Sequence, residues 1–137
     1  MSLSRTSGYS GKTLSQKLGL VPGMKAVSFF APKEYKTWLG SNGSIVKKGI
    51  SPQWDFVHLF TNEIAELERQ LVRLRSEIKP DGMIWVSWYK KSSKLPTEIT
   101  EDIIRDTCLP LGLVDVKVCA VSEEWSGLKL VIRVALR

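Results

Sequence analysis

Apolar residues in the middle of the chain recur at the spacing of a helix. Successive positions lie three or four residues apart, which predicts one buried helical face comprising Ile64, Leu67, Leu71, Leu74 and Ile78. The segment is too short for a coiled coil, so we expect it to pack on a sheet. The sequence Pro-Asp-Gly at 80–82 predicts the end of this helix and a turn.

Alternating or uniformly apolar runs predict the strands. These are residues 24–30, 44–47, 54–60, 83–88, 114–120 and 128–136. The run at 83–88 is apolar on both faces, which is typical of a central strand covered by helices on each side. The segment SEEWSG lies between the last two runs, which predicts an antiparallel hairpin with Gly127 supplying a backbone angle in its turn.

Three further helices are indicated by their first and last residues. Thr13 and Gly19 are typical of the start and end of a short helix. Pro32 suits the first turn of another helix, which reaches Leu39. The last one is capped by Thr97 or Thr100 and closed by Pro110 and Gly112, with an apolar face of Ile99, Ile103, Ile104, Cys108 and Leu111.

The order of these elements predicts an α/β fold. Alternating helices and strands favour three αβα layers around a mostly parallel sheet, here ending in an antiparallel β-hairpin. Residues 1–10 are polar and Ser-rich, which predicts a flexible N-terminal arm. The remaining residues, 11–137, have the length of a single α/β domain.

Composition narrows the setting and the chemistry. The net charge is +6, and all of this excess lies in residues 1–60, which suits either a phosphate-bearing partner or simply scattered surface lysines. There is neither an apolar run near ~20 residues nor a signal-like start, so we expect a cytoplasmic protein away from the membrane. Two cysteines without metal-like spacing predict reduced, buried thiols, and one histidine argues against a multi-histidine metal site.

Two resemblances follow from longer motifs. WDFVHLF, the helix after it and KPDGMIWVSW resemble the fourth strand, fourth helix and fifth strand of class I methyltransferases, over roughly the last 85 residues. This implies a Rossmann-like, methyltransferase-like fold. YSGKTLSQKLGL, PDGMIWVSW, LGLVDVKVCAV and EEWSGLKLVIR resemble, over nearly the whole chain, the bacterial family described only as domain of unknown function 3052. That resemblance implies a bacterial, cytoplasmic setting and no particular reaction.

The cofactor motifs of methyltransferases are missing from the matching positions. The family needs a glycine-rich turn after its first strand and an acidic residue at the end of its second. Here these positions read Ala-Pro-Lys-Glu at 31–34 and Val-Lys-Lys at 46–48. We therefore expect no cofactor and predict a non-enzymatic binding module. A divergent S-adenosylmethionine-dependent methyltransferase remains the alternative.

The loop after the predicted central strand is the candidate site. Ligands of open α/β sheets bind beyond the carboxyl ends of the strands, and ammonium groups, hydroxyls and a helix start suit an anion. The candidate residues are Trp88, Lys90, Lys91, Ser92, Ser93, Lys94, Thr97 and Thr100. The alternative is a solvated surface loop, since Glu98, Glu101 and Asp102 are able to satisfy the same helix end.

Other candidate chemistry is weaker. The string Gly-Lys-Thr at 11–13 lacks the earlier glycine of a phosphate loop, because Thr6 stands there. His58 is predicted to be a strand histidine satisfied by a neighbour, and we assign no catalytic residue. Trp85 is predicted to lie in the core, and the other tryptophans suit core edges or a homo-oligomer surface. Aromatics beside a basic loop leave nucleic acid open as a partner.

Overall fold

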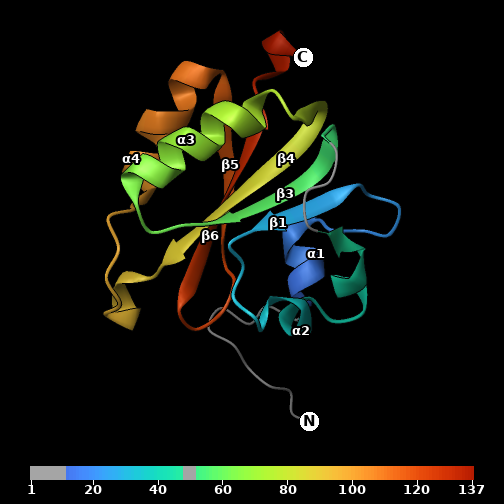
Figure 1. Ribbon diagram of the computed structural model, residues 1–137, viewed down its shortest axis with the longest axis vertical. Coiled ribbons are helices and arrows are strands. Elements are labelled where there is room, and N and C mark those ends of the chain that lie inside the picture. Colours follow the sequence, from blue (N-terminus) through green and yellow to red (C-terminus); the bar gives the residue numbers. More distant parts are fainter. Residues whose placement is uncertain (1–11, 48–51) are drawn as a thin grey trace.

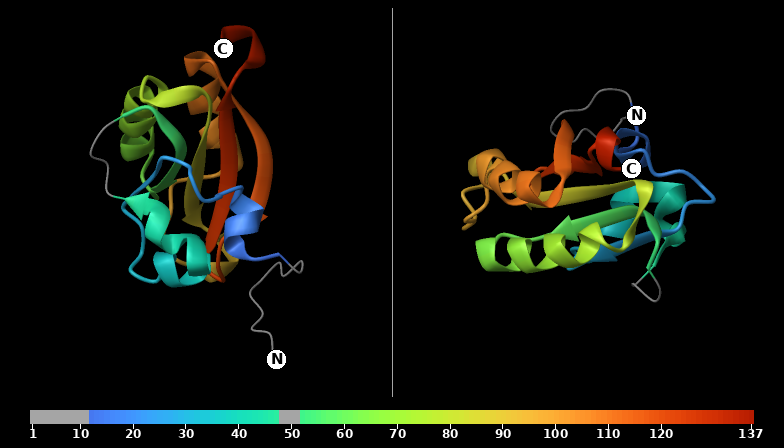
Figure 2. Two further views of the ribbon diagram at one scale, coloured as in Figure 1. Left: turned by 90° about the vertical axis from the view of Figure 1, so that its right-hand side faces the viewer. Right: turned by 90° about the horizontal axis from the view of Figure 1, so that it is seen from above.

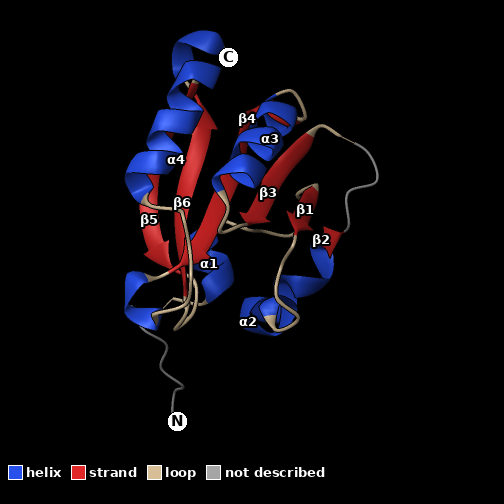
Figure 3. Ribbon diagram, turned by 60° about the vertical axis from the view of Figure 1, so that its left-hand side comes forward, coloured by secondary structure: helices blue, strands red, loops and turns tan. Residues whose placement is uncertain are grey.

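A computed structural model describes residues 12–47 and 52–137. All the strands in this part of the chain form one six-stranded sheet, in the order β2-β1-β3-β4-β6-β5 (Figures 1 and 3). The strands are β1 Ala26–Phe29, β2 Val46–Lys47, β3 Trp54–Phe60, β4 Ile78–Tyr89, β5 Leu113–Ala120 and β6 Trp125–Ile132. Strands β1 to β4 run parallel, and β6 lies antiparallel between β4 and β5. The predicted α/β class and its closing hairpin are therefore confirmed.

Helices cover both faces of the sheet. They are α1 Leu14–Leu18, α2 Tyr35–Leu39, α3 Ile64–Arg75 and α4 Glu101–Cys108, with 3₁₀ turns η1 Gly40–Ile45, η2 Lys91–Ser93, η3 Leu109–Leu111 and η4 Val134–Leu136. The apolar faces of α3 and α4 share one core with one side of the sheet, and those of α1 and α2 share a second core with the other side. Figure 1 shows α3 and α4 side by side, and Figure 2 shows α1 far from the C-terminus.

The helix ends follow capping chemistry that the sequence carries. Thr13 and Gln16 form a capping box at the start of α1, and Gly19 ends it with φ 75°. The hydroxyl of Thr100, rather than Thr97, caps α4 by accepting from the backbone N–H of Ile103 at 3.1 Å. Helix α2 begins at Tyr35, three residues after the predicted start.

The predicted boundary after α3 was wrong. The helix ends at Arg75, and Ile78 already pairs with Trp54 as the first residue of β4. Pairing then shifts register, so that Phe56 lies opposite Met83, and the Pro-Asp-Gly segment at 80–82 is an irregularity within the strand rather than a turn before it. Glycine is needed at 82 because a Cβ there would lie 2.7 Å from the carbonyl oxygen of Trp54.

The hairpin also differs from the prediction. Strand β6 begins at Trp125, so Gly127 lies within the strand and not in the turn. A Cβ at Gly127 would lie 3.0 Å from Cγ2 of Val121 and 3.2 Å from Cε3 of Trp85, so the reason for glycine is close packing. The strand ends at Ile132, and exposed Val134 and Leu136 belong to η4. The predicted arm at 1–10 lies outside the described residues, as do Gly11 and Lys48.

Candidate functional site

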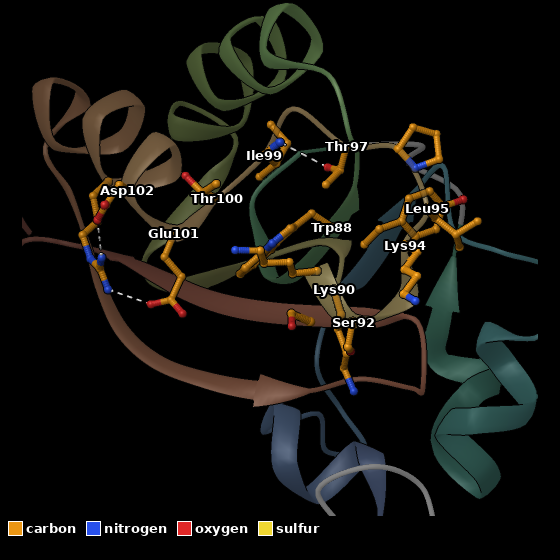
Figure 4. A pocket seen from close by; sticks show the side chains of 15 residues that line it. Trp88, Lys90, Ser92, Lys94, Leu95, Thr97, Ile99, Thr100, Glu101 and Asp102 are labelled. Atoms are coloured by element: carbon orange, nitrogen blue, oxygen red, sulfur yellow. Dashed lines mark hydrogen bonds and ion pairs between the residues drawn. The ribbon is translucent and has the colours of Figure 1, made fainter.

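An open pocket of about 1020 Å³ lies beyond the carboxyl end of β4 (Figure 4). Its walls come from the loop after β4, the first turns of α4, and Ser126 of β6. The lining includes seven of the eight predicted site residues: Trp88, Lys90, Lys91, Ser92, Lys94, Thr97 and Thr100. The structure thus brings these residues together, and we call the cavity the 90–94 pocket.

Ser93 is the predicted site residue that does not line the pocket. Its hydroxyl donates to the carbonyl of Lys90 at 2.7 Å and accepts from the N–H of Leu95 at 3.1 Å. Both bonds hold the tight η2 turn, which ends at Lys94 in the left-handed region with φ 61°. Ser93 therefore shapes the loop that presents its neighbours.

The wall between β4 and α4 is fixed by Asn62, which the sequence did not single out, and by Glu98, which was expected at the start of α4. The side-chain oxygen of Asn62 accepts from the N–H of Tyr89 at 2.8 Å, and its carbonyl accepts from the N–H of Glu98 at 2.9 Å. Glu98 in turn accepts from the N–H of Ile64 at 2.8 Å and so serves the start of α3, not that of α4. The only sequence signal for this was a polar Asn at the carboxyl end of a strand.

Two hydroxyls at the start of α4 face the pocket. Thr97 Oγ1 accepts from the N–H of Ile99 at 3.1 Å, and Thr100 Oγ1 accepts from the N–H of Ile103. Each hydroxyl keeps its own hydrogen, which is able to donate to a bound acceptor. Half-buried Tyr89 leans on Trp125 with ring centroids 4.4 Å apart, so aromatic surface adjoins these donors.

Arg105 contacts the carboxylates on the acidic side of the pocket. Its guanidinium lies 2.9 Å from Glu101, 3.1 Å from Asp102 and 2.9 Å from Asp115 on β5. The pKa of Arg105 is raised above its usual value, and the hydrogen bond to Asp115 is the largest cause. This single guanidinium therefore offsets one of the three negative charges and holds Glu101 and Asp102 in place at the start of α4.

The three lysines of the pocket carry the remaining charge. Within the described parts of the chain, no salt bridge engages Lys90, Lys91 or Lys94. Burial, and then the charge of Lys17, lower the pKa of Lys90. The arrangement is suited to an anion, with charge from the lysines and directed donors from the hydroxyls.

Comparison with solved structures identifies the fold. A protein from Sulfolobus solfataricus assigned to the type 11 methyltransferases superposes with a TM-score of 0.61 at 13% identity, covering 92% of this chain and 93% of that one. A SAM-dependent methyltransferase from Aquifex aeolicus gives 0.58 at 14% identity, over 84% and 85% of the two chains. The CcbJ methyltransferase from Streptomyces caelestis gives 0.56 at 8% identity, over 88% and 87%.

This protein has the methyltransferase-like Rossmann fold. At these identities the likeness concerns the fold alone. No family model matches the chain, and no curated protein matches it either. The closer resemblance, to domain of unknown function 3052, therefore stays a prediction.

The cofactor position of the methyltransferase-like fold has unusual geometry here. Phe30 directly follows β1 and precedes the 31–34 turn, and it adopts φ 61° with 62% of its surface exposed. Phe30 borders two small cavities of about 380 Å³ and 280 Å³ at the carboxyl ends of β1 and β3. The next turn contains Pro32, which has no N–H to donate.

His58 is fully buried in the core, and its ring nitrogens are satisfied by neighbours as predicted. Nδ1 lies 2.7 Å from the hydroxyl of Tyr35, and Nε2 lies 2.7 Å from the hydroxyl of Ser87. Burial lowers the pKa of His58 to about 3, so the ring is neutral, and burial raises the pKa of Tyr35. This buried chain of hydrogen bonds links α2 to β3 and β4, and Tyr35 also lines the 380 Å³ cavity.

The two cysteines agree with the expected buried thiols only in part. Cys108 and Cys119 are free thiols, the first buried and the second half-buried. Among residues 12–47 and 52–137, no group of three or more His, Cys, Asp or Glu side chains is placed to hold a metal ion. In the same ranges, the helices are too short or too polar to cross a membrane.

Proposed function

We propose that this protein is a non-enzymatic binding module on a methyltransferase-like scaffold, with an anionic ligand held in the 90–94 pocket. The observation that carries the proposal is the uneven charge compensation of the pocket. Its carboxylates are engaged by Arg105, whereas Lys90, Lys91 and Lys94 have no ion-pair partner among the described residues. Phosphate groups match this combination of ammonium groups and hydroxyl donors.

The second support is the geometry after β1. A cofactor held in the methyltransferase manner needs backbone close to its sugar and amino-acid groups, which glycine permits. Here the chain has Phe30, whose ring is bulky, and Pro32, which has no backbone N–H to donate. The strand end at Val46–Lys47 supplies no carboxylate for ribose hydroxyls. These features favour a scaffold without S-adenosylmethionine.

The test is calorimetric titration with inorganic pyrophosphate, repeated at several salt concentrations. Replacing Lys90, Lys91 and Lys94 together by Gln should lower affinity by at least about tenfold and flatten its salt dependence. A matched control removes the same charge elsewhere, at Lys12, Lys33 and Lys36, which do not line the 90–94 pocket. Equal effects of the two triple variants would refute the assignment of the site.

The rival function is a divergent S-adenosylmethionine-dependent methyltransferase. It is favoured by the structural neighbours, because they superpose over most of this chain and include a SAM-dependent methyltransferase. Titration of the same sample with S-adenosylmethionine separates the two proposals. We expect no saturable heat, and clear saturable binding that Phe30→Trp abolishes would establish the rival instead.

A further inference from the structure

The 90–94 pocket has carboxylates at one end and an ammonium group at the other. Figure 4 shows Glu101 and Asp102 on the left, towards α4, and Lys94 with Leu95 on the right. Among the residues that the structure describes, no salt bridge joins a lysine of the pocket to either carboxylate. The two kinds of charge are therefore presented separately to anything that enters the pocket.

The acidic end keeps a net negative charge. Arg105 lies 3.1 Å or less from Glu101, Asp102 and Asp115, so one guanidinium faces three carboxylates. The side chains of Glu101 and Asp102 are still 43% and 88% exposed. A cation that arrives from solvent can therefore reach both side chains, and the uncompensated negative charge attracts it.

The lining of the pocket suits a stretch of polypeptide better than a small metabolite or a nucleobase. Nearly half of the lining residues are exposed, including Lys94, Leu95 and Pro96, whereas small-molecule sites usually enclose most of their ligand. Trp88 is only 7% exposed, so its ring is no platform for a base. An extended segment lying across the pocket can place one side chain at each charged end.

We propose that the 90–94 pocket binds a phosphorylated segment of a partner protein, in which a basic residue lies within a few positions of the phosphorylated one. The inference rests on the proposed anion site and names its ligand class. The phosphate binds to the ammonium groups and to the hydroxyls of Thr97 and Thr100, and the basic side chain binds to Glu101 and Asp102. Apolar groups of the segment cover the surface next to Lys94.

The acidic end favours such a segment over nucleic acid. A strand with one phosphate at the lysines can continue across the pocket only by bringing further phosphates towards Glu101 and Asp102. Like charges repel there, whereas an arginine or lysine side chain is attracted. A phosphorylated basic peptide carries both signs of charge, as the pocket does.

The test measures fluorescence anisotropy of fluorescein-labelled nine-residue peptides that hold one phosphoserine and one arginine among glycines and alanines. The arginine is placed one to four positions before or after the phosphoserine, and each peptide has a partner with neutral citrulline instead. At the best spacing, arginine should tighten binding by about fivefold, the upper range for one exposed ion pair. Glu101→Gln with Asp102→Asn should abolish this ratio. The lost carboxylates act on the phosphate of both peptides alike, so the ratio isolates the arginine.

Two controls keep the result specific. Glu68→Gln with Asp106→Asn removes the same charge from residues outside the pocket and should preserve the fivefold ratio. In the natural sequence, high salt should bring the ratio close to one, a result that needs no variant. Thermal unfolding checks that each variant is folded.

The outcomes separate this inference from the anion site. Equal affinities of the arginine and citrulline peptides at every spacing would refute the inference, and the anion site would stand if both peptides still needed Lys91 and Lys94. If neither the peptides nor pyrophosphate needed these lysines, the proposed function would fail as well.

Three competing ligands complete the test. The unphosphorylated arginine peptide should bind at least tenfold more weakly, and equal binding would overturn the proposal. Free O-phosphoserine that displaces the labelled peptide at the peptide's own dissociation constant would make the ligand a small molecule. An oligothymidylate that does so would make it nucleic acid, and either displacement would overturn the assignment to a protein partner.

Discussion

Lowering the pH should destabilise the protein through His58, at pH values above those at which the Asp and Glu side chains become protonated. The ring is fully buried between Tyr35 and Ser87, and its pKa falls from 6.5 to about 3. Because the pKa of His58 is lower in the folded chain, His58 becomes protonated in the unfolded chain at pH values where it stays neutral in the folded chain. The stabilisation is therefore complete above pH 6.5 and is lost progressively as the pH falls towards 3.

The size of the effect follows from the two pKa values. One pKa unit corresponds to 1.36 kcal/mol, so the full difference is worth roughly 5 kcal/mol. Between pH 7 and pH 5 the unfolded histidine becomes almost fully protonated and the folded one does not. The free energy of unfolding should drop by about 2 kcal/mol over this interval, where ordinary carboxylates contribute little.

Urea denaturation between pH 5 and 7 measures this change. His58→Gln is the control, because an amide can pair with both hydroxyls and does not titrate. The variant is expected to show a nearly flat free energy of unfolding over the same interval. The chain has one histidine, so its imidazole proton resonance is unambiguous in NMR spectra. A resonance that titrates near pH 6.5, or equal pH slopes in the two proteins, would refute the reasoning.

Two substitutions test the backbone geometry. Gly127→Ala places a Cβ within 3.2 Å of Trp85 and within 3.0 Å of Val121, so the free energy of unfolding should fall by about 1–3 kcal/mol, and an unchanged urea midpoint would contradict this. At Phe30, where φ is 61°, a Gly variant should be more stable than an Ala variant by roughly 1 kcal/mol, the reverse of the usual order. Thermal unfolding of the two variants checks the sign.

Local patterns predicted most of the elements because the signals were themselves local. Strand β3 lies where its apolar run predicted it, and Thr100 caps α4 through a contact three residues away. Ile78 continues the helical spacing of α3, but its pairing with Trp54, across 24 positions, draws it into β4. Strand pairing with Trp54 therefore outweighs the helical spacing of Ile78, and the spacing of apolar residues does not reveal that partner.

The candidate site was predictable as a loop and not as a set of contacts. Its position beyond a central strand follows from the α/β order, and seven of its eight proposed residues line the cavity. The role of Arg105 depends on Asp115, which lies on another element, and that of Asn62 depends on the backbone N–H groups of Tyr89 and Glu98. Such partners are set by tertiary structure, and no spacing rule gives them.

The hydrogen bonds of Asn62 and Glu98 bear on how quickly a ligand is captured. They tie residues 62–64 to the segment 89–98 and so hold one wall of the pocket in place. In the proposed binding module, a wall held in this way would need little free energy to become ordered around the ligand. Its association rate should then be governed by diffusion and long-range attraction to lysines, with no slow opening step before encounter.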